Sequence, residues 1–395
     1  MHSKNMHLQK TIHLLYLFTV LRSALFVVPI ITLYYDLYKG VGISGLYISE
    51  SAFALGCLVM AVPAGWLGDK WQRKYVLTIG AAMVTLGFTI ELFGYGLFMM
   101  SLGELIVGIG FGCTSGSLSA MAYDCYAAME REDEHLHYQS NIMSMQQISS
   151  AAGALLGGWV YTLYPDGPQL MTVISVFLAI FCALAMVEPP RYTEVSKVHP
   201  VRDMLVTIKY TLHGHKEVAC LVLMAVVVLT YTKVSFWLHQ PYYREVALPD
   251  VYFGVLVCAG MVASVGGAQL AKLEKYLSGK VLVMLILLYP AVMYLSAAAL
   301  QNYAGLIFVV LANAAFSFVK PILAHAINKR VTSERRGAIN GTQDMCTNLA
   351  FILTAWSVGR MAEDYNAYVA MVVTTLVFLA LASVVYFCLQ RHKVI

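Results

Sequence analysis

Long apolar runs divide this chain, and they constrain its fold more than any other feature of the sequence. Twelve runs of about 20 residues alternate with short polar segments. A bilayer core about 30 Å thick requires roughly 20 apolar residues in a helix. Because lipid offers no hydrogen-bond partner to a backbone amide, a run of this length must cross the bilayer as a helix. The sequence therefore predicts an all-α integral membrane protein with twelve transmembrane helices.

The composition excludes most soluble classes. Hydrophobic residues make up 59% of the 395 residues and charged residues only 12%, whereas soluble domains carry about 25% charged residues. So few charges cannot cover a soluble protein of this size, and a net charge of +4 gives no reason to expect a nucleic-acid partner. The eight cysteines show no metal-ligand spacing, so we read them as buried apolar side chains and expect no metal. The predicted spans are 11–35, 44–67, 75–98, 99–123, 140–164, 168–187, 218–240, 252–271, 281–300, 303–327, 337–360 and 367–388.

The distribution of Lys and Arg predicts the orientation. If the N-terminus is cytoplasmic, twenty of the 26 Lys and Arg residues fall on the cytoplasmic side, three on the opposite side and three within spans. Cytoplasmic loops of membrane proteins carry an excess of Lys and Arg. We therefore expect a multi-pass protein of the inner (plasma) membrane with both termini in the cytoplasm.

The longest connection divides the spans into six plus six. We expect an N-terminal six-helix bundle over 1–187, a cytoplasmic linker over 188–217 and a C-terminal six-helix bundle over 218–395. The linker opens with Pro189 and Pro190 and contains an amphipathic stretch at about 201–213. Its simplest interpretation is an interfacial helix that tethers the two bundles, and a regulatory or partner-binding helix is the alternative.

A charged turn follows the second span. It contains Gly65, Asp69, Lys70, Arg73 and Lys74. A small residue lets two helix ends approach closely, Asp69 can accept hydrogen bonds from a helix N-terminus, and Arg73 can reach an acidic partner. Such a clasp would hold one face of a two-state protein closed. The alternative is a basic loop that only obeys the topology rule.

This turn resembles the signature G-x-x-x-D-K/R-x-G-R-K/R of the major facilitator superfamily, with Gln72 where that family usually has Gly. A partial repeat follows span eight, from Gly267 to Lys272, with Lys280 further on. The resemblance covers the whole chain and implies the fold of that superfamily, with two six-helix bundles that expose a central cavity alternately to each side. It also implies that the charged turn is a conformational gate.

Two further stretches resemble motifs of that superfamily. Span five contains Ser149, Gly153, Gly157 and Gly158, which is similar to the glycine-rich motif of its proton-coupled exporters. The alternative for these residues is a small-residue face for close helix packing. The segment 115–124 at the end of span four resembles the signature of a bacterial efflux branch.

Four charged residues lie within spans. They are Arg22, Glu104, Lys233 and Lys320, one each in spans one, four, seven and ten. Charges at membrane depth are costly and usually face water or a partner. In the superfamily that the chain resembles, these four spans line the central cavity. We therefore predict that these residues and Trp237 contact the substrate.

Two roles compete for the buried charges. A carboxyl group in a partly dry cavity can load and release a proton, so Glu104, Asp344 and Asp36 are candidates for proton coupling. Three cations in the spans favour an anionic substrate, and Trp237 can stack on it or anchor the helix at the interface. Alternatively, Arg22–Glu104 and Lys320–Asp344 are ion pairs that only hold helices together.

Together these features predict a secondary transporter. The chain has no ATP-binding G-x-x-x-x-G-K-[ST] loop, so we expect a proton gradient as the energy source. It also lacks the cluster of polar residues that a membrane enzyme needs, so we expect neither an enzyme nor a cofactor. The first interpretation is proton-coupled efflux of a small amphipathic, anionic drug, metabolite or siderophore. The alternative is an importer of an organic anion or ferric siderophore. We expect a monomer in the lipid bilayer with a small-molecule substrate and no nucleic-acid partner.

Overall fold

The computed structural model describes residues 2–60, 63–190, 216–270, 276–392 and 394, and every regular element among them is helical. The amphipathic stretch at 201–213 lies outside the described residues, as do Ala271 and Lys272 of the partial repeat after span eight. Each of the twelve predicted spans coincides with one helix or with a region of consecutive shorter helices. The predicted all-α architecture is therefore confirmed.

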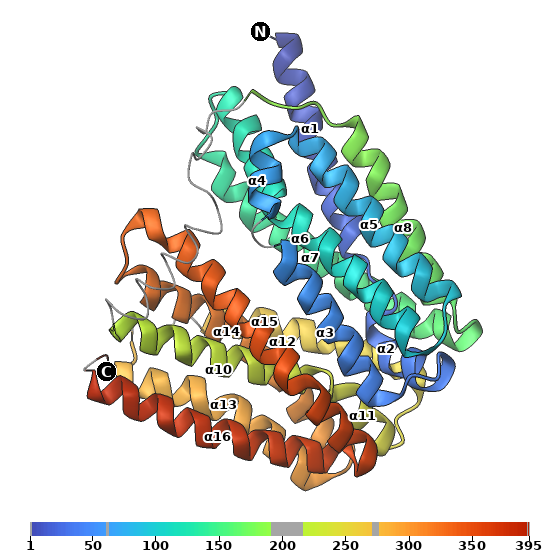
Figure 1. Ribbon diagram of the computed structural model, residues 1–395, viewed down its shortest axis with the longest axis vertical. Coiled ribbons are helices and arrows are strands. Elements are labelled where there is room, and N and C mark those ends of the chain that lie inside the picture. The colour runs from blue at the N-terminus through green and yellow to red at the C-terminus, as the bar shows by residue number, and fades with distance from the viewer. Residues whose placement is uncertain (1, 61–62, 191–215, 271–275, 393, 395) are drawn as a thin grey trace. The chain divides into compact units, whose positions relative to one another are not determined.

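The described residues of the first half of the chain form six helical regions (Figure 1). The first is broken into α1 (His2–Ser23), η1 (Val28–Ile30), α2 (Ile31–Leu33) and η2 (Tyr34–Tyr38). The others are α3 (Gly42–Met60) with α4 (Pro63–Lys70), α5 (Arg73–Phe93), α6 (Gly96–Ala128), α7 (Glu134–Leu163) and α8 (Gly167–Ala185).

The second half repeats this arrangement. Its first region is again broken, into α10 (Lys216–Phe236) and α11 (His239–Glu245). It continues with η3 (Asp250–Tyr252) and α12 (Phe253–Leu270), α13 (Gly279–Leu300), α14 (Gly305–Asn328), α15 (Ser333–Asp364) and α16 (Ala367–Arg391). Within each half we call the helix ends on the side of that half's own chain terminus proximal, and the opposite ends distal.

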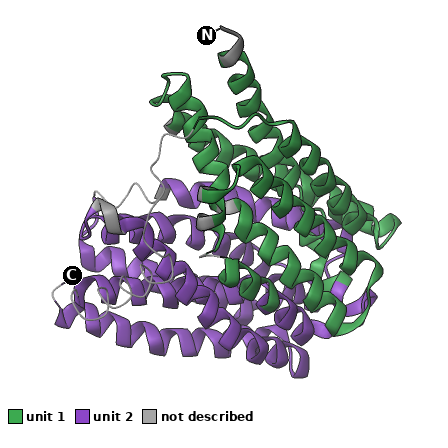
Figure 2. Cartoon of the chain, turned by 45° about the horizontal axis from the view of Figure 1, so that its top comes forward, with its two compact units in different colours: residues 1–34, 52–200 green, residues 35–51, 201–395 purple. Residues whose placement is uncertain are grey.

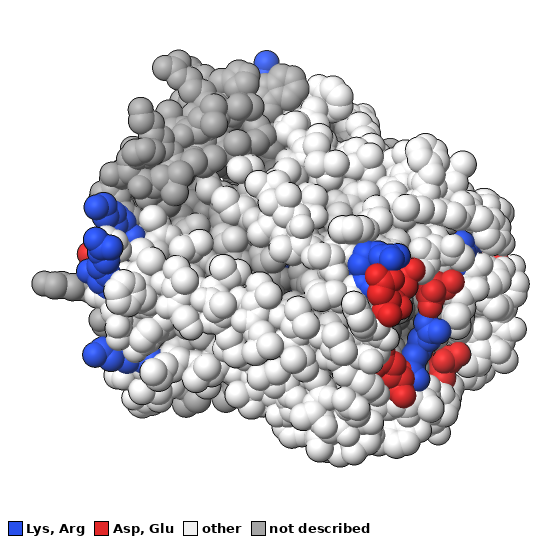
Figure 3. Space-filling model, turned by 60° about the horizontal axis from the view of Figure 1, so that its bottom comes forward, with Lys and Arg blue, Asp and Glu red and all other residues white. Residues whose placement is uncertain are grey.

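Ten of these regions are long and apolar enough to cross a membrane. The other two, α7 and α15, contain 30 and 32 residues, long enough for about 45 Å at 1.5 Å per residue, but they carry many polar residues. They occupy the same place, the fifth helix, in each half. Figure 3 shows a broad uncharged face with Lys and Arg at one end and mixed charges at the other. The chain is therefore a multi-pass membrane protein.

By contacts the chain forms two compact units (Figure 2). Unit 1 comprises residues 1–34 and 52–200, and unit 2 comprises residues 35–51 and 201–395. The division at 1–187 and 218–395 stays a prediction, and the contact-based units differ from it mainly in the segment 35–51. Residues of the first two helical regions thus pack within the second unit.

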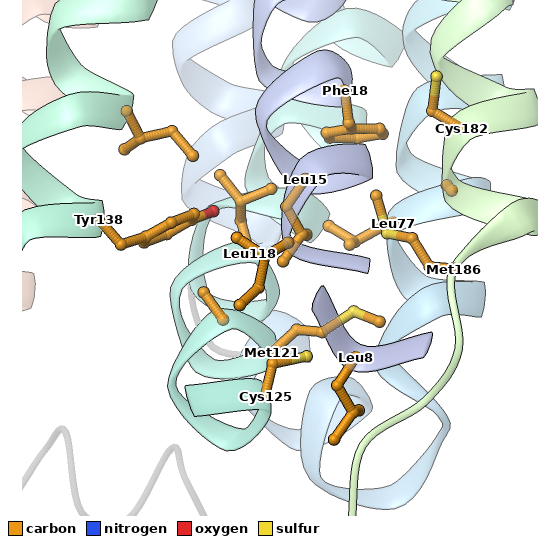
Figure 4. Packing of buried hydrophobic residues seen from close by; sticks show 14 of the residues in the cluster. Leu8, Leu15, Phe18, Leu77, Leu118, Met121, Cys125, Tyr138, Cys182 and Met186 are labelled. Atoms are coloured by element: carbon orange, nitrogen blue, oxygen red, sulfur yellow. The ribbon is translucent and has the colours of Figure 1, made fainter. Parts of the chain in front are cut away.

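The core of unit 1 lies toward its proximal end. Helices α1, α5, α6, α7 and α8 contribute buried apolar side chains that meet there, including Leu15, Phe18, Leu77, Met121 and Cys182 (Figure 4). In unit 2, α12 packs on α14, α13 packs on α14 and α16, and α10 packs on α14, α15 and α16. Helix contacts in a membrane depend on close fit rather than on removal of apolar surface from water, so these contacts fix where the charged residues lie.

Candidate functional site

The proximal clasp of unit 1 is built around Arg73, the first residue of α5. Its guanidinium forms an ion pair with Asp124 near the end of α6, and both side chains are buried. The same Nη1 donates to the Ala120 carbonyl oxygen at 2.9 Å. A buried charge pair is retained only with good geometry and further hydrogen bonds. Arg73 therefore fixes the end of α6 against the start of α5.

Glu188 adds a second acid to this clasp. Its carboxylate accepts hydrogen bonds from the backbone N–H of Arg73 at 2.8 Å and of Lys74 at 3.0 Å. The first N–H groups of a helix have no partner within the helix, and a negative charge is favourable there. Glu188 thus caps α5 and joins the start of the 188–217 linker to the clasp.

Sequence reasoning expected an acidic partner for Arg73 but did not identify Asp124 or Glu188. The available signal was that both acids end spans, the fourth and the sixth, on the same predicted membrane face as Arg73. The side chains of Gly65 and Asp69 lie outside the described residues, while Lys70 is exposed and the Lys74 ammonium lies 5.0 Å from the ring centre of Tyr75. The role of the whole motif as a gate stays a prediction.

A short acidic segment follows α6 and precedes the predicted span 140–164. Within it, Arg131 donates to Glu134 at 2.7 and 2.6 Å. Hydrogen bonding to Arg131 holds the pKa of the Glu134 carboxyl below its usual value. Both side chains are exposed, so we read this pair as a solvated surface contact.

The first helical region is interrupted after Ser23, near the middle of its candidate membrane span Asn5–Tyr38. An interruption removes helical hydrogen bonds, and at membrane depth other groups must replace them. Three serine hydroxyl groups donate hydrogen bonds to backbone carbonyl oxygens at this interruption. Ser149 of α7 donates to the Val20 carbonyl oxygen at 2.6 Å, Ser150 donates to that of Ser23 at 3.1 Å, and Ser175 of α8 donates to that of Leu21 at 2.7 Å.

The glycine-rich stretch of α7 lies along the same interruption. A Cβ atom added to Gly153 would lie 3.5 Å from the backbone nitrogen of Leu25, and one added to Gly157 would lie 1.8 Å from the carbonyl oxygen of Phe26. Gly158 is also buried. Gly157 therefore lets the irregular segment 24–27 lie directly on α7.

Arg22 precedes this interruption and is buried, with 8% of its surface exposed. Its Nη2 donates to the Phe111 carbonyl oxygen at a long 3.4 Å, and its Cζ lies 4.1 Å from the centre of the Phe111 ring. Among the described residues its Nε has no hydrogen-bond partner and no carboxylate forms an ion pair with it. Glu104, buried in α6, is therefore not the counter-ion that the structural-pair alternative assigned to Arg22.

Unit 2 contains a second polar group, between α10 and α15. Lys233 donates to Asn348 Oδ1 at 2.9 Å, and its Nζ lies 4.4 Å from the centre of the Phe351 ring. Trp237 lies one helical turn further on, and its indole Nε1 is buried without a hydrogen-bond partner among the described residues. Lys233 near the end of α10 and Trp237 in the turn that follows it therefore both carry N–H donors.

The remaining charged candidates form ion pairs. Lys320 of α14 lies 3.7 Å from Asp344 of α15, and about half of each side chain is exposed. Lys320 and Asp344 thus form the ion pair that the structural-pair alternative expected, but their exposure shows that protein does not enclose the pair. Asp36 forms an ion pair with Arg244 of α11 at the distal end of unit 2. No group of three His, Cys, Asp or Glu side chains in the described part of the chain could hold a metal ion.

Comparisons with known proteins agree with this architecture. The sequence pattern of the Major Facilitator Superfamily matches residues 12–355. The quinolone resistance protein NorA of Staphylococcus aureus is 21% identical over 204 residues, which is 51% of each chain. Protein spinster homolog 1 of Bos taurus is 28% identical over 172 residues, 42% of this chain and 31% of that protein. The chain thus spans about half or less of the curated relatives that it matches.

Solved structures support the fold independently. The nucleoside transporter NupG superposes with a TM-score of 0.77 at 16% identity and covers 97% of this chain and 99% of its own. An identity this low bears on the fold alone. The pattern match over most of the chain, together with the paired six-helix halves, establishes that this protein belongs to the Major Facilitator Superfamily of membrane transporters.

Proposed function

We propose that this transporter moves a small amphipathic anion across the inner membrane by alternating access, and that it exports this cargo in exchange for protons. The observation that carries the proposal is the state of Arg22. A buried guanidinium offers five N–H donors, and here it makes one long hydrogen bond and one contact with an aromatic face. A buried charge without a partner is costly, by about 3–5 kcal/mol when a partner is removed. An anionic cargo would supply the missing partner.

The position of Arg22 supports this proposal. Binding sites in transporters of this type lie near the membrane midplane, often at interrupted helices. Arg22 directly precedes such an interruption in the first helical region, and the ring of Phe111 offers an apolar surface beside the guanidinium. A planar carboxylate next to an aromatic group would fit both. In unit 2 we propose Lys233 and Trp237 as further cargo contacts, because both side chains offer N–H donors.

The exposed pair Lys320–Asp344 supports the presence of an aqueous pathway. Charged groups at membrane depth avoid lipid and face protein or water. About half of each of these side chains is exposed, so we infer that they face water. The polar composition of α15, and of α7 at the equivalent place in unit 1, fits the same interpretation.

For proton coupling we propose Glu104 first, followed by Asp344 and Asp36. Glu104 is buried in the same helix as Phe111, the residue that contacts Arg22. Binding of an anion near Arg22 and protonation of a carboxylate in the same unit would each change the local charge. The two events are then coupled, because the charge state at one site changes the affinity of the other for its ligand.

Transport into inverted vesicles tests this proposal. NorA is named for quinolone resistance, and quinolones combine an aromatic ring system with a carboxylate, so a fluorescent quinolone is a suitable probe. We expect uptake driven by an acidic vesicle interior, abolished by a protonophore, and lowered at least tenfold by Arg22→Gln. Arg22→Lys is the matched control, because it retains the charge, and a lipophilic cationic dye tests selectivity for anions.

The outcomes separate the parts of the proposal. Uptake driven only by the opposite gradient would favour the importer. Quinolone transport that is equal in wild type and Arg22→Gln would refute the role of Arg22. Preference for the cationic dye would refute an anionic cargo.

A further inference from the structure

A cysteine side chain lies near the buried guanidinium of Arg22. The Arg22 Nη2 donates to the Phe111 carbonyl oxygen of α6 at 3.4 Å, and the Cys57 Sγ of α3 donates to the Gly108 carbonyl oxygen of α6 at 3.4 Å. Phe111 and Gly108 are three residues apart, so their carbonyl groups lie about one turn from each other along the same face of α6. Arg22 and Cys57 are also close enough to interact electrostatically. All four residues belong to unit 1.

Close packing of α3 on α6 fixes this arrangement. A Cβ atom added to Gly56 would lie 2.4 Å from the Leu105 carbonyl oxygen, and one added to Gly108 would lie 2.1 Å from that of Phe53. Side chains at these positions would force the two backbones apart, so both residues must be glycine for the helices to approach this closely. The backbone of Cys57, the residue after Gly56, is therefore held against α6.

The surroundings of Cys57 combine a cation with aromatic rings. Phe53 lies one turn before Cys57 in α3, and its ring centre is 5.8 Å from that of Phe111. The Arg22 guanidinium lies over the Phe111 ring, 4.1 Å from its centre. The Arg22 Nε is buried without a hydrogen-bond partner among the described residues, so this cation can still accept an anionic partner. Cys57 itself is partly exposed, which leaves its thiol within reach of a small molecule.

We propose that Cys57 is a modification site for small anionic reagents that exchange with thiols, and that Arg22 attracts the reagent and pairs with the charge that it leaves attached. A guanidinium binds oxyanions through several N–H donors. The attraction between unit charges is stronger where water is partly excluded, so Arg22 would favour a negatively charged reagent over a positively charged one. The matching class of natural reagent is a low-molecular-weight disulfide that carries carboxylates.

The reaction is thiol exchange and needs no separate oxidant. The Cys57 thiol gives its proton to water, and the resulting thiolate attacks the sulfur atom that bears the charged chain of the reagent. A new S–S bond forms at Cys57, and the bond between the two sulfur atoms of the reagent breaks. The leaving group departs with the electron pair of that bond. It is a thiolate when the reagent is a disulfide and methanesulfinate when the reagent is a methanethiosulfonate.

Two methanethiosulfonates of opposite charge test the proposal. The other native cysteines are replaced by alanine, and the purified protein in detergent is treated with the anionic sulfonatoethyl or the cationic trimethylammonioethyl reagent. Intact-protein mass spectrometry gives each rate, which is divided by the rate of the same reagent with free mercaptoethanol to correct for intrinsic reactivity. We expect the corrected rate to be higher for the anionic reagent by about fivefold or more, the effect of one unit charge at about 4 Å in water.

The contribution of Arg22 is measured in the same background. Arg22→Gln should lower the ratio of the two corrected rates by about fivefold, whereas Arg22→Lys retains the charge and should keep the anionic preference. Raising the salt concentration from about 0.01 M to about 1 M should also lower the ratio, because salt screens the charge, and this measurement needs no substitution of Arg22. A variant that retains only Cys258 of α12, which is also partly exposed, is the matched control, and its ratio should not respond to Arg22→Gln.

A corrected ratio near one, or a preference that neither Arg22→Gln nor salt lowers, would overturn the proposal. So would failure of both reagents to modify Cys57 until the protein is unfolded, because the thiol would then face lipid or protein. The inference rests on the anion-binding role proposed for Arg22, but its test uses no cargo, transport or proton gradient. Equal quinolone transport in wild type and Arg22→Gln would refute that role for the cargo and leave the thiol ratios unchanged.

Discussion

Replacing Gly157 by alanine should destabilise the protein, whereas the same replacement at Gly153, one turn earlier in α7, should not. The added Cβ at position 157 would lie 1.8 Å from the Phe26 carbonyl oxygen and 2.8 Å from its carbon. Ordinary contacts of such atoms are about 3.5 Å, so the segment 24–27 and α7 would have to separate by about 1.5 Å. The hydrogen bonds that hold the interruption, including Ser149 to Val20, would lengthen with it.

The magnitude follows from opposing contributions. Alanine gains about 0.5–1 kcal/mol over glycine within a helix. Overpacking costs about 1–3 kcal/mol, and each weakened hydrogen bond adds about 1 kcal/mol. At Gly157 we therefore expect a net loss of about 2 kcal/mol. At Gly153 the nearest atom is 3.5 Å away, so only the gain of about 0.5–1 kcal/mol remains.

Thermal unfolding of the two purified variants in the same detergent measures this difference. We expect a midpoint below that of the wild type for Gly157→Ala and an unchanged or slightly higher midpoint for Gly153→Ala. Equal midpoints, or a more stable Gly157→Ala, would show that the segment 24–27 does not lie on α7 as described.

Two further substitutions probe polar groups of unit 1 in the same unfolding assay. The Tyr138 hydroxyl is buried without a hydrogen-bond partner among the described residues and faces the apolar cluster of Figure 4. Tyr138→Phe should therefore leave the free energy of unfolding unchanged or raise it by about 1 kcal/mol. A clear loss of stability would mean that the hydroxyl has a partner. Asp124→Asn should lower the free energy of unfolding by about 3–5 kcal/mol, because it leaves Arg73 buried without its counter-charge. Adding Arg73→Gln to this variant should recover part of that loss. Additive losses would contradict a coupled pair.

Helix positions were predictable because the bilayer fixes their length. The span predicted at 367–388, for example, corresponds to α16 at Ala367–Arg391. The interruption after Ser23 was harder to predict. Pro29 disfavours a continuous helix over the preceding residues, but Pro290 and Pro321 lie inside α13 and α14 without ending them. Tertiary contacts distinguish the first region: serine hydroxyls on neighbouring helices donate hydrogen bonds to the interrupted backbone, and a glycine leaves room for the irregular segment.

The candidate site was predictable as a set of residues but not as a set of partners. Charged residues are scarce in the spans, so the sequence alone indicates Arg22, Lys233 and Lys320 as candidates. Their partners come from other helices, with Asn348 lying 115 residues beyond Lys233, and no sequence spacing encodes such a distance. The same applies to Asp36 and Arg244, which are 208 residues apart.

The environments of three charged groups differ in burial and in the partners that they offer. Arg73–Asp124 is enclosed by protein, so breaking this ion pair is costly. Asp36–Arg244 is partly exposed, and water can replace each partner at little cost. Arg22 is buried, and among the described residues no ion pair joins it to a carboxylate. If Arg22 had only a structural role, its charge would be a persistent cost to stability. A bound cargo anion would remove that cost, and the gain would contribute to the affinity for the cargo.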